Sequence, residues 1–144
     1  LCPLIFQSGG ITMNDLMTRN IYDVRGRVLV CGACLPSTHP EGFAALCRGA
    51  DEVYSLCLEQ THINMAVTKL GAMLSTGQIT SLRFASVDRS PHCTQLHYIK
   101  HELERMMTIS IPIEDYVVPD AEPMKISDET IDLSKSLARL EKLK

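Results

Sequence analysis

RVLVCGAC, residues 27 to 34, is the stretch of the sequence that decides the fold. Its first five residues, Arg27 to Cys31, form an almost continuous apolar run, as expected of a strand that is covered on both faces. The turn Cys31-Gly-Ala-Cys34 then leaves the carboxyl end of this strand. A buried strand of this kind, followed by a turn and a helical pattern, is typical of the first unit of a parallel α/β sheet.

Segments of similar character recur along the chain and predict three further strands. They are Glu52 to Leu58, Ile79 to Val87, and Thr108 to Ile113. Pro112 has no N–H to donate to a neighbouring strand, so the last segment is expected at a sheet edge. Apolar residues at intervals of three and four predict the helices. These carry Phe43 to Cys47, Ile63 to Leu74, Leu96 to Met106, and a final helix after Ser127.

Alternation of strands with helices predicts the fold class. We expect a single α/β domain over residues 1–144, with three layers and a mostly parallel sheet of about four strands. Helices would cover both faces, as in flavodoxin-like and Rossmann-like folds. The structure of residues 1–25 is uncertain from the pattern, apart from a candidate helix over Met13 to Ile21.

The composition excludes several classes of partner. Of the 144 residues, 22% are charged, the formal net charge is −3, and no run of Lys or Arg occurs. A nucleic-acid partner is therefore not expected. The apolar runs fall short of the roughly 20 residues that span a bilayer, and Leu1 to Phe6 carries no basic leader. We expect no membrane insertion and a cytoplasmic location. Since the chain begins at Leu1, whether it is a fragment stays open.

Four cysteines are predicted to meet at one edge of the sheet. Cys31 ends the first strand, Cys34 lies in the turn after it, and Cys57 ends the second strand. Cys93 falls in the opening turn of a helix for which Ser90 is a suitable N-cap. The carboxyl ends of parallel strands share one edge, where α/β proteins bind their ligands.

All-thiolate ligation suits an iron–sulfur cluster or, alternatively, zinc. The leading hypothesis is a small redox protein that holds an iron–sulfur cluster through Cys31, Cys34, Cys57 and Cys93. It would pass electrons to a redox partner protein or a larger complex. The helix N-terminus is expected to lower the pKa of Cys93. His62 and His92 lie in the adjoining loops and are candidates to hydrogen-bond a thiolate or replace a ligand.

Two other functions remain open, and with them the question of enzymatic activity. Cys31 and Cys34 could form a metal-free dithiol for disulfide exchange or persulfide transfer, with Cys93 as a thiol of low pKa. The chain could also be a non-catalytic assembly subunit. Cys47 is expected to be a packing residue, and Cys2 receives no role.

Histidines four residues apart on one helix can form a two-histidine metal face, but the HExxH pattern is absent around His97 and His101. These two histidines are therefore expected on a solvated helix face.

The order of strand-Cys, helix, Gly-Ala-Asp and strand-Cys resembles the delta subunit of methyl-viologen-reducing hydrogenases. It is carried by Val30-Cys31 and by Gly49 to Val53 before Cys57, over about residues 27 to 64. The resemblance implies an iron–sulfur electron carrier, although Thr61-His62 stands where that family has Cys-His. The turn at Cys31 to Cys34 is also similar to that of DsrE-type sulfur-relay proteins, which implies sulfur chemistry.

Overall fold

The computed structural model describes residues 5–8 and 11–144, with the backbone alone for residues 5–8 and 11. Cys2 lies outside the described residues. The strands are β1 (Ile5–Ser8), β2 (Ile11–Asp15), β3 (Gly26–Gly32), β4 (Glu52–Leu56), β5 (Ile79–Val87), β6 (Ile113–Val118) and β7 (Met124–Ile126). The α-helices are α1 (Leu35–Thr38), α2 (Pro40–Cys47), α3 (Ile63–Ser75), α4 (Pro91–Thr94), α5 (Tyr98–Met106), α6 (Asp128–Ser134) and α7 (Leu137–Lys142). The 3-10 helices are η1 (Leu16–Thr18), η2 (Ile21–Asp23) and η3 (Gln95–His97).

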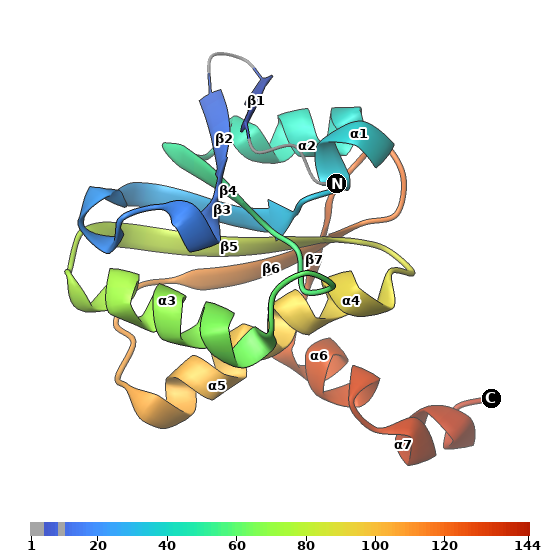
Figure 1. Ribbon diagram of the computed structural model, residues 1–144. Helices are drawn as coiled ribbons and strands as arrows, with labels where there is room; N and C mark the ends of the chain where they lie inside the picture. Colours follow the sequence, from blue (N-terminus) through green and yellow to red (C-terminus); the bar gives the residue numbers. More distant parts are fainter. Residues whose placement is uncertain (1–4, 9–10) are drawn as a thin grey trace.

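These strands form one sheet in the order β1-β2-β4-β3-β5-β6-β7 (Figure 1). The strands from β2 to β6 run parallel, whereas β1 and β7 pair antiparallel at the two edges. The prediction of an α/β domain with a mostly parallel sheet is confirmed. Chain order reverses at β3, which has β4 on one side and β5 on the other, and this is the place where such sheets bind ligands.

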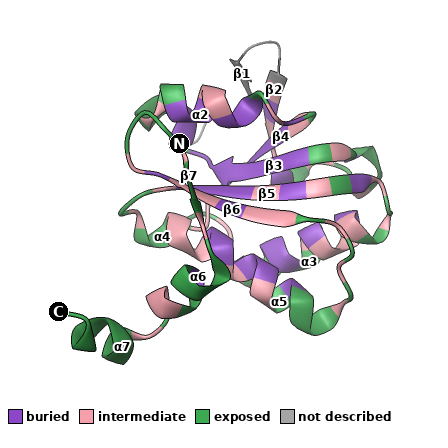
Figure 2. Cartoon of the chain, turned by 180° about the vertical axis from the view of Figure 1, so that it is seen from behind, coloured by how far each residue is buried: buried purple, intermediate pink, exposed green. Residues whose placement is uncertain are grey.

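Different helices cover the two faces of the sheet. Successive side chains of a strand point to opposite faces, so each strand contributes to both layers. Val28 and Val30 of β3 pack with α3 and α5 in one apolar cluster. Leu29 and Cys31 pack with α1 and α2 in the other. β3 and β5 are therefore largely buried (Figure 2). The apolar run from Arg27 to Cys31 therefore reflects a strand covered on both faces.

The prediction of a helix over Met13 to Ile21 is wrong. Met13 belongs to β2, where it pairs with Val53, and its side chain is fully buried. Asp15 and Asn20 then accept hydrogen bonds from backbone N–H groups two residues on, and each opens a single 3-10 turn. Local capping therefore prevails over the weak helical periodicity of this segment.

The fourth strand begins later than the sequence predicted. β6 starts at Ile113, and Pro112 precedes it as a loop residue whose carbonyl accepts from the N–H of Leu82. β6 lies inside the sheet between β5 and β7. Pro112 therefore limits where the strand begins and does not mark a sheet edge.

The helix predicted after Ser127 is present but broken. α6 begins at Asp128 with Ser127 as its N-cap, and a second cap at Ser136 begins α7. α7 projects from the body of the domain (Figures 1 and 2). Among the described residues, no helix has both the length and the apolar character needed to cross a membrane.

The packing of α3 against the sheet gives a first testable prediction. Leu70 of α3 has no exposed surface. Leu70→Ala leaves a cavity and should reduce the free energy of unfolding by about 2–5 kcal/mol. Leu137→Ala is the control, because 81% of Leu137 is exposed. Urea unfolding that gave equal losses for both variants would contradict the arrangement of this face.

Candidate functional site

A small pocket of about 100 Å³ lies at the carboxyl ends of the central strands. Residues 32–34 at the end of β3 and residues 56–59 at the end of β4 form part of its wall. The rest of the wall comes from the end of β5 and the segment that follows it, with Val87, Ser90, His92 and Cys93. Cys34, Cys57 and Cys93 therefore line one pocket, each from a different loop.

Cys93 occupies the space above Gly32. A Cβ atom built on Gly32 would lie 2.2 Å from the Sγ atom of Cys93, far inside van der Waals contact. Ser90 is the N-cap of α4, as predicted, and its side chain accepts from the N–H of Cys93 at 3.3 Å. Gly32 and the N-cap at Ser90 together position the Cys93 thiol at the carboxyl end of β3.

Cys34 and Cys57 are held by turns of the backbone. The carbonyl of Cys34 accepts from the side chains of Ser37 and Thr38, at 3.0 and 2.8 Å. The carbonyl of Cys57 accepts from the N–H of Thr61 at 2.9 Å. Cys34 is exposed, whereas Cys57 and Cys93 are half-buried. The pocket thus offers one accessible thiol and two sheltered ones.

Cys31 does not join these three thiols. Its side chain is fully buried on the opposite face of the sheet, where its Sγ atom lies 3.8 Å from Sδ of Met13. Burial, with smaller contributions from Cys47 and Cys93, raises the pKa of Cys31 well above its ordinary value. Cys47 packs on the same side, as predicted, and burial raises its pKa to about 11.

The expectation of a lowered pKa at Cys93 is wrong. Burial raises the pKa of Cys93, and the charges of Cys34 and Cys57 raise it further. Hydrogen bonds from the backbone at Val87 and from Ser90 lower it by less. α4 has only four residues, so its dipole does not outweigh the loss of solvation. The Cys93 thiol is therefore neutral near pH 7, and Cys34 and Cys57 lie close enough to contribute to the rise of its pKa.

The predicted histidines differ in position. His92 lies at the rim of the pocket, and its Nδ1 atom is 4.0 Å from Oε2 of Glu59 on the opposite wall. His62 is the exposed N-cap residue of α3 and does not line the pocket. In the described part of the chain, no three His, Cys, Asp or Glu side chains are grouped closely enough to hold a single metal ion as they stand.

A buried polar cluster that sequence reasoning missed joins β5 and β6 to the end of η3. His97, expected on a solvated face, is 3% exposed and contacts Ser86 and Asp115. Leu96 and Ile99 pack in one apolar cluster with residues of β5 and β6. This part of the helical segment therefore faces the sheet, and His97 is buried together with it. A signal was present in the sequence, since Ser86 and Asp115 are polar residues within otherwise apolar strands.

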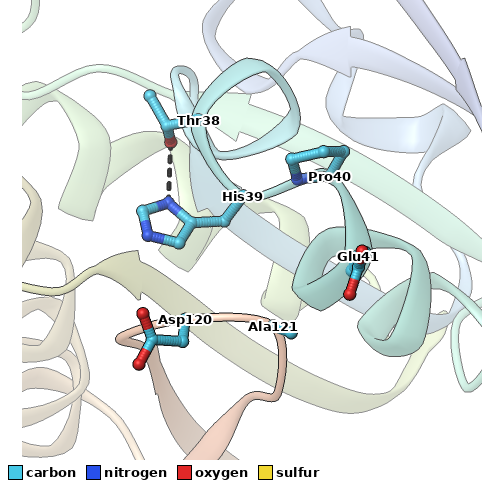
Figure 3. Close-up of a pocket in the computed structure, with 6 residues that line it drawn as sticks. All are labelled: Thr38, His39, Pro40, Glu41, Asp120 and Ala121. Atoms are coloured by element: carbon cyan, nitrogen blue, oxygen red, sulfur yellow. Dashed lines mark hydrogen bonds between the residues drawn. The ribbon is translucent and has the colours of Figure 1, made fainter.

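A larger recess of about 440 Å³ lies near the same edge, beside α1 and α2. Figure 3 shows His39 at the α1–α2 junction and Asp120 in the turn after β6. Nδ1 of His39 lies 2.9 Å from the hydroxyl of Thr38. Thr38, Glu41 and Asp120 are exposed, so this recess is a solvated surface hollow.

Gly32→Ala tests the contact with Cys93. The added methyl group must displace the thiol, so stability should fall by about 1–3 kcal/mol and Cys93 should react faster with iodoacetamide. In the unmodified chain this reaction should speed up as the pH rises through the raised pKa of Cys93, because the thiolate is the nucleophile.

Gly77→Ala is the matched control. Gly77 has a φ of +75° and no atom within 4 Å of a built Cβ, so its substitution strains the backbone without touching Cys93. Mass spectrometry of the labelled peptides measures both variants. Equal labelling rates at Cys93 would show that Gly32 does not hold the thiol in place.

Comparison with known proteins agrees with this architecture. The Rossmann-like domain family matches residues 24–143, from two residues before β3 to the residue after α7. Neither the curated proteins nor the solved structures gave a match to the chain. The matched region contains the central parallel strands and the whole cysteine pocket. The chain belongs to the Rossmann-like domain family.

Proposed function

We propose that this protein is a small redox protein that binds an iron–sulfur cluster through Cys34, Cys57 and Cys93. The cluster would pass electrons to a partner protein or larger complex. One observation carries the proposal: three thiols from three separate loops line a single pocket at the reversal point of the sheet. Thiolates gathered in this way favour soft metals and clusters.

The protonation state of Cys93 supports a cationic ligand. Burial raises the pKa of Cys93, and the neighbouring charges of Cys34 and Cys57 raise it further. A bound iron centre would supply positive charge that reverses this effect, and Cys34, Cys57 and Cys93 would hold it as thiolates. Binding of the iron centre would replace the repulsion between neighbouring thiolates with attraction to the metal.

Zinc is the alternative to a cluster. A single zinc ion needs its ligands to converge on one point. In a cluster the thiolates attach to different iron atoms, so ligands spread around a pocket are suitable. A fourth ligand would come from the rim, where His92 and Glu59 lie, or from outside the chain.

Access to the pocket fits electron transfer to another protein. Cys34 is exposed, so a cluster bound to it would lie near the surface and within reach of a docked partner. The described cysteines are all free thiols. A cytoplasmic, reducing location would keep them available for ligation.

A second function is favoured by the exposure of Cys34. An accessible thiol beside two sheltered thiols is also suited to disulfide exchange or persulfide transfer without metal. Cys34 would act with Cys57 or Cys93, since Cys31 faces the other side of the sheet. The raised pKa of Cys93 makes it a poor nucleophile near pH 7, and we therefore rank this function second.

Iron and sulfide analysis after anaerobic purification and reconstitution tests the proposal. The unmodified chain should contain both, with the visible absorption of a cluster. Cys57→Ser and Cys93→Ser should lose the cluster and the stability that it adds, because binding to the folded state stabilises that state. A chain that stays colourless and metal-free, yet exchanges disulfides rapidly at Cys34, would replace the redox-carrier proposal with the second function.

Cys47→Ala and Cys31→Ala are the matched controls. Both thiols are buried among apolar side chains away from the pocket, so both variants should keep the cluster and lose at most a few kcal/mol of stability. Loss of iron from Cys47→Ala with retention in Cys93→Ser would overturn the assignment of the ligands.

A further inference from the structure

α7 is a short helix that stands away from the body of the domain (Figure 1). None of its six residues, all of which the structure describes, is buried. Leu137 is 81% exposed, Leu140 39%, and Leu143, directly after the helix, 69%. Residues three apart share a helix face, so these leucines form one apolar stripe. A helix this short is not stable by itself in water, and it depends on packing against another surface.

α6 anchors the base of α7 to the domain. Ile131 of α6 is 2% exposed, and the hydroxyl groups of Ser134 and Tyr98 lie 2.9 Å apart. Residues 135–136 are the whole link between the two helices. The leucine stripe is therefore carried by a helix whose starting point is fixed next to α5.

The charges on these two helices have opposite signs. α6 carries three acidic residues and no basic one, namely Asp128, Glu129 and Asp132. Residues 135–144 carry four basic residues and one acidic residue, namely Lys135, Arg139, Lys142, Lys144 and Glu141. Within the described chain, the side chains of Glu129, Arg139 and Lys142 form no ion pair. Both charges are thus available to a partner.

A surface with both signs on adjacent helices is complementary to a second copy of itself. In a two-fold interface the same patch lies on both sides, so each helix can face the other helix of its partner. α7 of one copy would then lie antiparallel on α6 of the other, with basic side chains beside acidic ones in both halves. A patch of a single sign would instead require a partner of different composition.

α6 also offers the leucine stripe an apolar contact. Leu133 is half-buried and lies two residues after the buried Ile131. Residues two apart point to nearly opposite sides of a helix, so Leu133 is on the side of α6 that faces away from the sheet. An antiparallel α7 places Leu137 near this residue and the basic end of α7 near the acidic start of α6.

We propose that α6 and α7 form a two-fold dimer interface, in which α7 of each copy packs antiparallel on α6 of the other. The inference goes beyond the proposed redox function and requires neither a cluster nor the thiol pocket. Burial of the leucines provides most of the attraction, and the charges set the direction, because exposed ion pairs are weak. Helices of six and seven residues are small beside the roughly 800 Å² per partner of a standard interface, so the dimer is weak.

Sedimentation velocity over a concentration series tests the dimer. The 144-residue chain should change from monomer to dimer between about 10 μM and about 1 mM, as expected of a small interface. Leu137→Glu should stay monomeric, because the dimer would bury its carboxylate. Met65→Glu is the matched control, since Met65 is 54% exposed but lies on α3, and it should dimerise like the unmodified chain.

Two results of this series would overturn the proposal. One is a chain that remains monomeric at every concentration, which would leave the leucine stripe to a different protein. The other is an assembly that keeps growing with concentration, because a two-fold interface closes on two copies.

Exchange of charge between copies tests the arrangement itself. Arg139→Glu with Lys142→Glu makes α7 acidic, and Glu129→Lys with Asp132→Lys reverses the charge of α6. Each double variant places like charges across both halves of the interface, so its dimer dissociation constant should rise about tenfold or more. All four side chains are exposed, so circular dichroism should show an unchanged fold.

An equal mixture of the two double variants should dimerise as readily as the unmodified chain. In the mixed dimer the acidic α7 meets the basic α6, and the unchanged α7 meets the unchanged α6, so both halves attract. A mixture that dimerises no better than either variant alone would show that α7 does not pack on α6 of a second copy.

Discussion

Side chains along β3 alternate between the two faces of the sheet, and this alternation decides which cysteines can meet. Val28 and Val30 face α3, whereas Leu29 and Cys31 face α2. The next residue on the first face is Gly32, where the missing side chain leaves room for Cys93. This alternation along β3 decides where the pocket lies. It also explains why three thiols line the pocket while Cys31 does not.

The same geometry sets the electrostatics of the site. A thiol packed against the sheet loses solvation, so the pKa of Cys93 rises and this thiol is neutral near pH 7. β5 connects this site to the polar cluster, because Ser86 lies within the strand and Val87 at its end lines the pocket. Removing one member of that cluster would leave buried polar groups without partners, which is costly in a protein interior.

Much of the fold could be predicted from the sequence because its strands are apolar and short. Ile79 to Val87 was predicted with the limits that β5 has, and α3 follows its apolar spacing. The 3-10 turn at Leu16–Thr18 and the late start of β6 could not be predicted, since Asp15 acts through a local hydrogen bond and Pro112 limits where the strand begins. Three of the four cysteines expected at one sheet edge line a single pocket, and Cys31 does not. RVLVC is apolar on both faces, so nothing in it showed that Cys31 faces away from Cys93.

Protection of individual cysteines by the bound cluster tests the central claim most directly. Reconstituted protein would be alkylated under anaerobic conditions before and after iron chelation, and each cysteine peptide measured by mass spectrometry. The account predicts that Cys34, Cys57 and Cys93 become reactive only after chelation, while chelation leaves the buried Cys31 unreactive. Alkylation of Cys34 and Cys93 in protein that still retains its full iron content would contradict it.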